Sequence, residues 1–291
     1  MKISMTNVSL DARFGVKDSL RMIKEAGFDA VDYDLCERGE HRQLTDDFIE
    51  HITDVRAYMD ELGLECSQVH APFPFFYNEE LELSNRRFLR MVRALEAASI
   101  LGATYVVVHS IEMPKELFGE TWSCNYKFYK ALQPYAEKFG VRIAIENLYI
   151  EDDKRKLYHA PGRFSDPKII TDFIEALDSD VFCICLDTGH AALCGIEPWV
   201  FIDNLPKKEL LCALHVHDVD YYSDTHTVPY ATNKYKGIDW EATMHSLYKA
   251  GYQGTLNLET HIFSQNFPAP LAADAVAFSA KVAKYLTTLF K

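Results

Sequence analysis

Short apolar segments alternate with longer amphipathic segments along the whole chain. Several of the short ones, such as VFCICL at residues 181–186, are continuously apolar. That character is typical of parallel strands covered on both faces. The pattern predicts eight strands, at residues 2–9, 29–35, 65–70, 104–109, 142–147, 181–187, 211–217 and 255–259.

The segments between these strands carry apolar residues at spacings of three and four, which predicts helices. A glycine stands between several of these helices and the following strand, as expected for a helix C-terminus. The segment at 45–64 has Thr45 as its expected N-cap. The other predicted helices lie at residues 16–28, 78–103, 121–140, 165–179, 196–209, 239–251 and 268–290.

Eight strands alternating with eight helices predict an α/β protein, a (β/α)8 TIM barrel. Right-handed crossovers in that number close a parallel sheet into a barrel. The length of 291 residues suits one such barrel, and no linker or change of composition divides the chain, so residues 1–291 are predicted to form a single domain. An open doubly wound sheet is the alternative, but no glycine-rich fingerprint follows the first strand.

Composition limits the cellular compartment and the kinds of partner that we expect for this protein. No apolar run approaches membrane-spanning length and the first residues do not resemble a secretory signal, so we expect no membrane partner. Seven cysteines form no CxxC pair, and most lie in apolar segments, which suits reduced thiols in a soluble cytoplasmic protein. The net charge of −13 argues against a broad nucleic-acid surface. The sequence leaves open whether the protein forms a homo-oligomer.

Side chains able to bind a metal ion stand at the carboxyl ends of six predicted strands. Parallel barrel strands open on one face, so these groups converge there. Carboxylates crowded beside an apolar core repel one another unless a cation neutralises them, and oxygen and imidazole ligands suit a hard or borderline divalent ion. The alternative is a rim of salt bridges, for which the strand ends show no obvious basic partner. The six residues are His70, His109, Glu146, Asp187, His215 and Glu259.

Further candidates lie in the loops after the sixth and seventh strands, namely His190, Asp224 and His226. For these, a second metal ion, hydrogen bonds to a substrate and simple packing stay open, as they do for the histidines of the third and fourth strands. His217 is expected to alternate away from His215 and to act as a neighbour that orients the site.

Two loops carry further side chains of interest. The aromatic segment at 71–77 would either stack on the C–H face of a sugar or pack beneath its own loop. Basic residues at 154–156 and Arg163 could meet an anionic group, although a solvated charged loop is favoured. No glycine-rich phosphate cradle is present, so nothing in the sequence supports a phosphorylated substrate.

The ordered series of strand-end motifs resembles the xylose-isomerase-like TIM-barrel superfamily. This superfamily contains sugar and sugar-phosphate isomerases and epimerases, and also DNA-repair enzymes of the endonuclease IV type. The resemblance extends over nearly the whole chain. Its motifs are VHAP at His70, VVVHS at His109, AIENL at Glu146, CLDTGHA at Asp187 and His190, LHVHD at His215 and NLET at Glu259.

The isomerase and epimerase branch implies one divalent ion, of the Mn²⁺, Zn²⁺, Co²⁺ or Mg²⁺ kind, bound by Glu146, Asp187, His215 and Glu259. Glu146 and Glu259 would also be the catalytic acid/base pair. On a small sugar or sugar derivative, one glutamate would remove the proton alpha to the carbonyl to give an enediolate, and the other would return a proton. Isomerisation or epimerisation of such a sugar is therefore the expected reaction.

The endonuclease branch supplies the alternative, a metal-dependent phosphodiesterase acting on abasic DNA. Its resemblance implies up to three ions, with His70, His109, His190, Asp224 and His226 completing the cluster. The DNA-intercalating loop residues of that branch have no evident counterpart here, which disfavours a nucleic-acid partner. A third alternative is a metal-dependent lyase or a sugar-binding relative that keeps the ion without isomerising.

Overall fold

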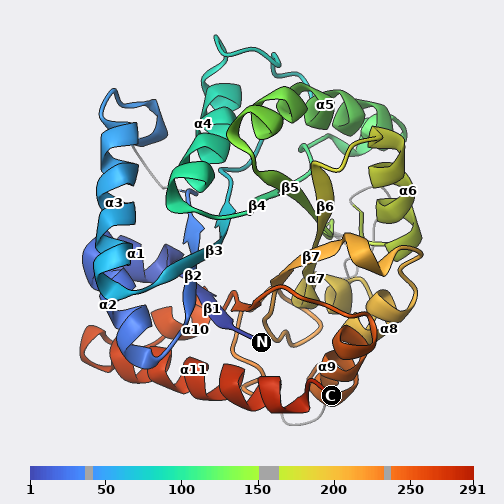
Figure 1. Ribbon diagram of the computed structural model, residues 1–291. Helices are drawn as coiled ribbons and strands as arrows, with labels where there is room; N and C mark the ends of the chain where they lie inside the picture. Colours follow the sequence, from blue (N-terminus) through green and yellow to red (C-terminus); the bar gives the residue numbers. More distant parts are fainter. Residues whose placement is uncertain (37–41, 151–163, 233–236) are drawn as a thin grey trace.

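Parallel strands form a ring in the centre of the molecule, and helices surround it (Figure 1). The computed structural model describes residues 1–36, 42–150, 164–232 and 237–291. Neighbouring strands follow chain order from β1 to β7, and β8 pairs with β1. The strands are β1 (Ile3–Thr6), β2 (Ala30–Asp34), β3 (Glu65–His70), β4 (Tyr105–Val108), β5 (Arg142–Glu146), β6 (Phe182–Asp187), β7 (Leu211–His215) and β8 (Leu256–Leu258).

An isolated bridge between Val216 and Leu258 joins the last two strands and nearly closes the ring. The backbone N–H of Val216 donates to the carbonyl of Asn257 over 2.8 Å, and the N–H of Glu259 donates to the carbonyl of Val216 over 3.0 Å. This closure brings the ends of β7 and β8 together. The predicted (β/α)8 barrel is confirmed.

One set of helices covers the outside of the barrel, and further short helices follow β1, β6 and β8. Of the segment predicted as helical at 196–209, only Pro198–Asp203 forms an α-helix. The outer helices are α2 (Val16–Ala26), α3 (Phe48–Leu62), α4 (Arg86–Leu101), α5 (Thr121–Phe139), α6 (Pro167–Leu177), α8 (Pro198–Asp203), α9 (Trp240–Lys249) and α11 (Ala272–Leu289). The short helices are α1 (Val8–Phe14), α7 (Thr188–Leu193) and α10 (His261–Gln265), and the 3₁₀ turns are η1 (Arg42–Leu44), η2 (Lys115–Glu120), η3 (Lys208–Leu210) and η4 (Ala269–Leu271).

Three predicted boundaries are wrong for local reasons. The first strand, predicted at 2–9, ends at Thr6 because the chain turns directly into α1. The helix predicted at 78–103 begins only after Asn85, whose side chain accepts hydrogen bonds from the first turn. Thr45 does not cap α3. Asp47 occupies that N-cap position instead.

Small apolar side chains from β4 to β7 pack inside the barrel. Val107, Ala144, Cys183, Cys185 and Ala213 form a buried apolar cluster on neighbouring strands, separate from the larger core between strands and helices. The thiols in this cluster therefore serve as small hydrophobic groups, as expected. Among the described residues, no helix has both the length and the apolar character needed to cross a bilayer.

Candidate functional site

The carboxyl ends of the strands open into a cavity of about 1070 Å³. Active sites of (β/α)8 barrels lie at this end. Asp187 and His215 do not line the cavity but are fully buried beside it. The predicted site residues in the cavity wall are His70, His109, Glu146, His190, Asp224, His226 and Glu259.

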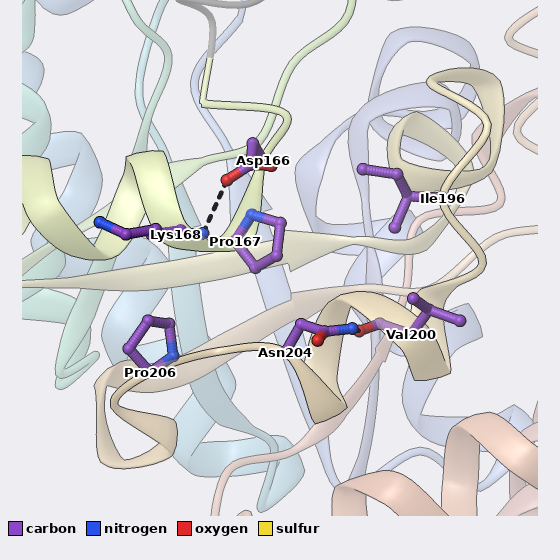
Figure 2. Close-up of a pocket in the computed structure, with 7 residues that line it drawn as sticks. All are labelled: Asp166, Pro167, Lys168, Ile196, Val200, Asn204 and Pro206. Atoms are coloured by element: carbon purple, nitrogen blue, oxygen red, sulfur yellow. Dashed lines mark hydrogen bonds between the residues drawn. The ribbon is translucent and has the colours of Figure 1, made fainter.

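A second pocket, of about 400 Å³, lies on the outside of the barrel (Figure 2). Its polar contact is the N-cap of α6, where Asp166 Oδ1 accepts the backbone N–H of Lys168 over 2.8 Å. No predicted site residue lines this pocket, so we place the candidate site in the barrel mouth. The lining residues are Asp166, Pro167, Lys168, Ile196, Val200, Asn204 and Pro206.

The period of the strands explains why the candidate ligands share one space. Side chains two residues apart on a strand point to the same face. Glu146 therefore lies on the same interior face as Ala144, and His215 on the same face as Ala213, each one step closer to the open end. On β4 to β7, small apolar residues lie one step below these ionisable residues.

The four predicted ligands meet around one ring nitrogen. His215 Nδ1 lies 3.3 Å from Glu259 Oε2, 3.5 Å from Glu146 Oε1 and 3.9 Å from Asp187 Oδ2. Within the described chain this nitrogen is buried without a hydrogen-bond partner. An imidazole lone pair surrounded by three carboxylates is a donor set that suits a divalent cation, so these residues fit the ion that the sequence predicted.

The two glutamates of this group differ in their electrostatics. Burial would raise the pKa of Glu146, but the neighbouring His109 and His215 outweigh burial and hold the pKa well below its usual range. For Glu259, burial raises the pKa, although His215 and His226 oppose the rise. The two glutamate carboxyl groups near His215 Nδ1 therefore have opposite tendencies to keep a proton.

His70 and His109 approach Glu146 from β3 and β4. His109 Nε2 lies 3.0 Å from Glu146 Oε2, and His70 Nε2 lies 3.8 Å from the same oxygen. The Nδ1 of His70 lies 3.3 Å from the Cys36 thiol. Both imidazoles therefore face the same carboxylate oxygen, which positions them for a second ion or for a substrate.

A further group of side chains lies near the other carboxylate oxygen of Glu146, Oε1. His190 Nδ1 lies 3.1 Å from Glu146 Oε1, while its Nε2 lies 3.4 Å from Asp224 Oδ2. His226 Nε2 lies 3.0 Å from the same Asp224 oxygen. Burial would raise the pKa of Asp224, but His226 and His190 hold it well below its usual range. His190, Asp224 and His226, with His217, form a set that could hold a further ion.

His217 points into the site, and the expectation that it would alternate away from His215 is wrong. Residues two apart in an extended segment share a side. Its Nε2 lies 2.9 and 3.0 Å from the two carboxylate oxygens of Asp187, and its ring stacks on His226 at 4.0 Å. His217 therefore orients Asp187 by direct contact.

The buried carboxylate of Asp218 organises the loop that carries Asp224 and His226. It accepts the backbone N–H groups of Val219 at 3.0 Å and Tyr230 at 3.1 Å. It also accepts the N–H of Ile238 at 3.3 Å and the indole N–H of Trp240 at 3.4 Å. Because these donors come from both ends of the loop, the Asp218 side chain holds the two ends together.

The aromatic segment at 71–77 contains a buried ring as well as exposed rings. Phe75 is buried and stacks on Phe128 at 4.8 Å. Phe73 lines the cavity, remains 47% exposed and stacks on His109 at 4.4 Å. One ring packs beneath the loop, and the other offers an open apolar face beside the candidate ligands.

Among the cavity residues that the sequence analysis did not name, three could join the predicted ligands in holding an ion: Asp34, Cys36 and His261. Asp34 ends β2 and Cys36 follows two residues later, so the strand-end rule applies to Asp34. His261 begins α10, two residues past the predicted strand, where no local pattern marks it. The predicted basic residues at 154–156 and Arg163 lie outside the described residues.

The sequence profile described as xylose isomerase-like TIM barrel matches residues 20–282. The chain belongs to this family. The resemblance stated from the strand-end motifs is thereby confirmed. No match was found among curated protein sequences.

Several solved structures share the family fold. A D-tagatose 3-epimerase-like protein superposes with a TM-score of 0.72 at 21% identity, covering 100% of this chain and 98% of that chain. A 3-keto-D-glucoside 4-epimerase from E. coli gives 0.69 at 20% identity, with coverage of 97% and 99%. A D-psicose 3-epimerase from Clostridium cellulolyticum H10, with D-tagatose, gives 0.71 at 15% identity, with coverage of 98% and 99%. At these identities the likeness concerns the fold.

Proposed function

We propose that this protein is a divalent-metal-dependent sugar isomerase or epimerase. The observation that carries the proposal is the unpartnered Nδ1 of His215, surrounded by carboxylate oxygens of Glu146, Asp187 and Glu259 within 3.9 Å. Membership of the xylose isomerase-like family supports it, and so do structural relatives whose names describe epimerases of tagatose, psicose and a keto-glucoside.

In this proposal Glu146, Asp187, His215 and Glu259 hold one ion of the Mn²⁺, Co²⁺, Mg²⁺ or Zn²⁺ kind. The bound ion would polarise the carbonyl group of the substrate. Glu146 and Glu259 both approach His215 Nδ1, at 3.5 and 3.3 Å, and in the proposal one carboxylate takes the proton alpha to the carbonyl while the other returns a proton to the enediolate. The substrate is a small sugar or sugar derivative.

Hydrogen exchange with solvent tests this reaction directly. The Mn²⁺-loaded protein is incubated in D₂O with a set of unphosphorylated ketoses, and deuterium alpha to the carbonyl is followed by NMR and mass spectrometry. Glu146→Gln and Glu259→Gln should each lower the exchange rate by roughly 10² to 10⁴-fold while thermal unfolding shows an intact fold. Glu137→Gln on the outer face of α5 is the matched control and should exchange like the wild type. Near-full exchange in both site variants would refute the acid/base roles.

A second candidate function, phosphodiester cleavage at abasic DNA, is favoured by one observation. His190, Asp224 and His226 converge at one side of Glu146, and His70 and His109 at the other, so the cavity has donors for more than one ion. Elemental analysis separates the two proposals. About three zinc ions per chain together with cleavage of abasic duplex would favour the endonuclease, whereas one ion and no cleavage would favour the isomerase.

A further inference from the structure

A layer of polar side chains crosses the inside of the barrel one step below the candidate ligands. Asp32 on β2 is buried, and its Oδ2 accepts the side-chain amides of Asn257 at 2.8 Å and Gln68 at 3.1 Å. Ser4 donates in turn to Asn257 Oδ1 at 2.9 Å. A buried carboxylate is costly unless it is paired, and no Lys or Arg in the described part of the chain forms an ion pair with Asp32.

His215 faces Asp32 from the opposite side of the barrel. Its Nε2 lies 3.3 Å from Asp32 Oδ2, on the side of the ring away from the three carboxylates. Within the described residues neither ring nitrogen of His215 has a hydrogen-bond partner, and Asp32 Oδ1 has none either. Its Nδ1 faces Glu146 and Glu259 at 3.5 and 3.3 Å. An ionised carboxylate can only accept a hydrogen bond, so an N–H on Nε2 satisfies Asp32 and leaves the lone pair of Nδ1 for an ion.

We propose that Asp32 is a positioning residue for the metal site, which holds His215 with its proton on Nε2 and its Nδ1 aimed at the ion. The inference rests on the proposed function, because it needs an ion bound by His215. Carboxylates that accept the second N–H of a metal-bound histidine fix the ring orientation and raise its basicity, and their loss weakens metal binding about 10- to 100-fold. Asp32 acts through His215 and does not contact the substrate.

Measuring the affinity for Mn²⁺ tests the positioning role of Asp32 without any substrate. In Asp32→Asn the dissociation constant for Mn²⁺, obtained by competition with a chelating dye, should rise by about 10- to 100-fold. Ser4→Ala is the matched control, since Ser4 belongs to the same polar layer but contacts Asn257 and not His215. Its affinity should stay within about twofold of the wild type. An Asp32→Asn affinity within about threefold of the wild type would overturn the inference.

Two further readouts separate positioning from a general structural role. Asp32→Asn should regain most of its turnover at saturating Mn²⁺, which a misfolded site would not do. In wild-type protein loaded with Zn²⁺, ¹⁵N spectra should show the His215 proton on Nε2, and a proton on Nδ1 would refute the inference even if the variant failed to fold. A wild type that binds no Mn²⁺ would overturn the proposed function and this inference together, whereas equal binding by wild type and Asp32→Asn would overturn only the inference.

Discussion

Loading the metal-free protein with Mn²⁺ should raise its Tm by an amount that follows from the ion concentration and the length of the chain. The ion would neutralise the carboxylates that surround His215 Nδ1 within 3.9 Å. A ligand that binds only the folded state, present at 100 times its dissociation constant, stabilises by about 2.7 kcal/mol. Unfolding entropy of about 2.1 cal/mol/K per residue gives about 0.6 kcal/mol/K for this chain of 291 residues, so Tm should rise by roughly 4 °C.

Differential scanning calorimetry after chelator treatment, with and without Mn²⁺, measures this shift. Glu259→Gln removes one ligand charge, and tenfold weaker binding at the same Mn²⁺ concentration would reduce the stabilisation to about 1.4 kcal/mol and the shift to roughly 2 °C. His51→Gln on α3, outside the barrel mouth, should keep the full shift. A wild-type shift below about 1 °C, or an equal shift in Glu259→Gln, would refute the reasoning.

Three further predictions concern other parts of the cavity. Phe73→Ala should raise KM by about 2- to 10-fold with a smaller change in kcat, because an exposed ring that stacks on substrate contributes about 0.5–1.5 kcal/mol. Steady-state kinetics measures both constants, and an unchanged KM would show that the ring does not touch substrate. Gly189→Ala should weaken Mn²⁺ binding at least about tenfold, because a Cβ at this position would clash with Cε1 of the fully buried His217. An unchanged affinity in the dye competition would mean that the His217 ring moves aside freely. Burial raises the pKa of Asp34 from 3.8 to about 6, so the protein loses stability as the pH rises between these two values and does not regain it above them. Asp34→Asn should therefore stabilise the metal-free protein by about 1–3 kcal/mol at pH 8 and by little at pH 4, and urea unfolding with equal stabilities at pH 8 would contradict this.

The strand-end residues were predictable because two local rules suffice for them. Continuous apolar segments mark buried parallel strands, and a period of two places Glu146, Asp187 and His215 on the inner face at the open end. Asp34 obeys the same rule and was missed because the strand predicted at 29–35 ends on Leu35, one residue beyond the observed end of β2. Helix starts were less predictable, since Asn85 competes with several earlier polar residues for the cap position.

Sequence alone determined the barrel, its number of strands and the residues at its open end, because hydrophobic periodicity is a local property of the chain. Only the tertiary structure decided that His215 Nδ1 has no hydrogen-bond partner within the described residues, that Asp32 lies beneath it from the far side of the barrel, and that Phe73 stays open while a neighbouring ring is buried. The approach of Asp32 to His215 depends on barrel closure, which brings side chains of β2 and β7 to 3.3 Å although about 180 residues of chain separate them. No local pattern encodes such a distance.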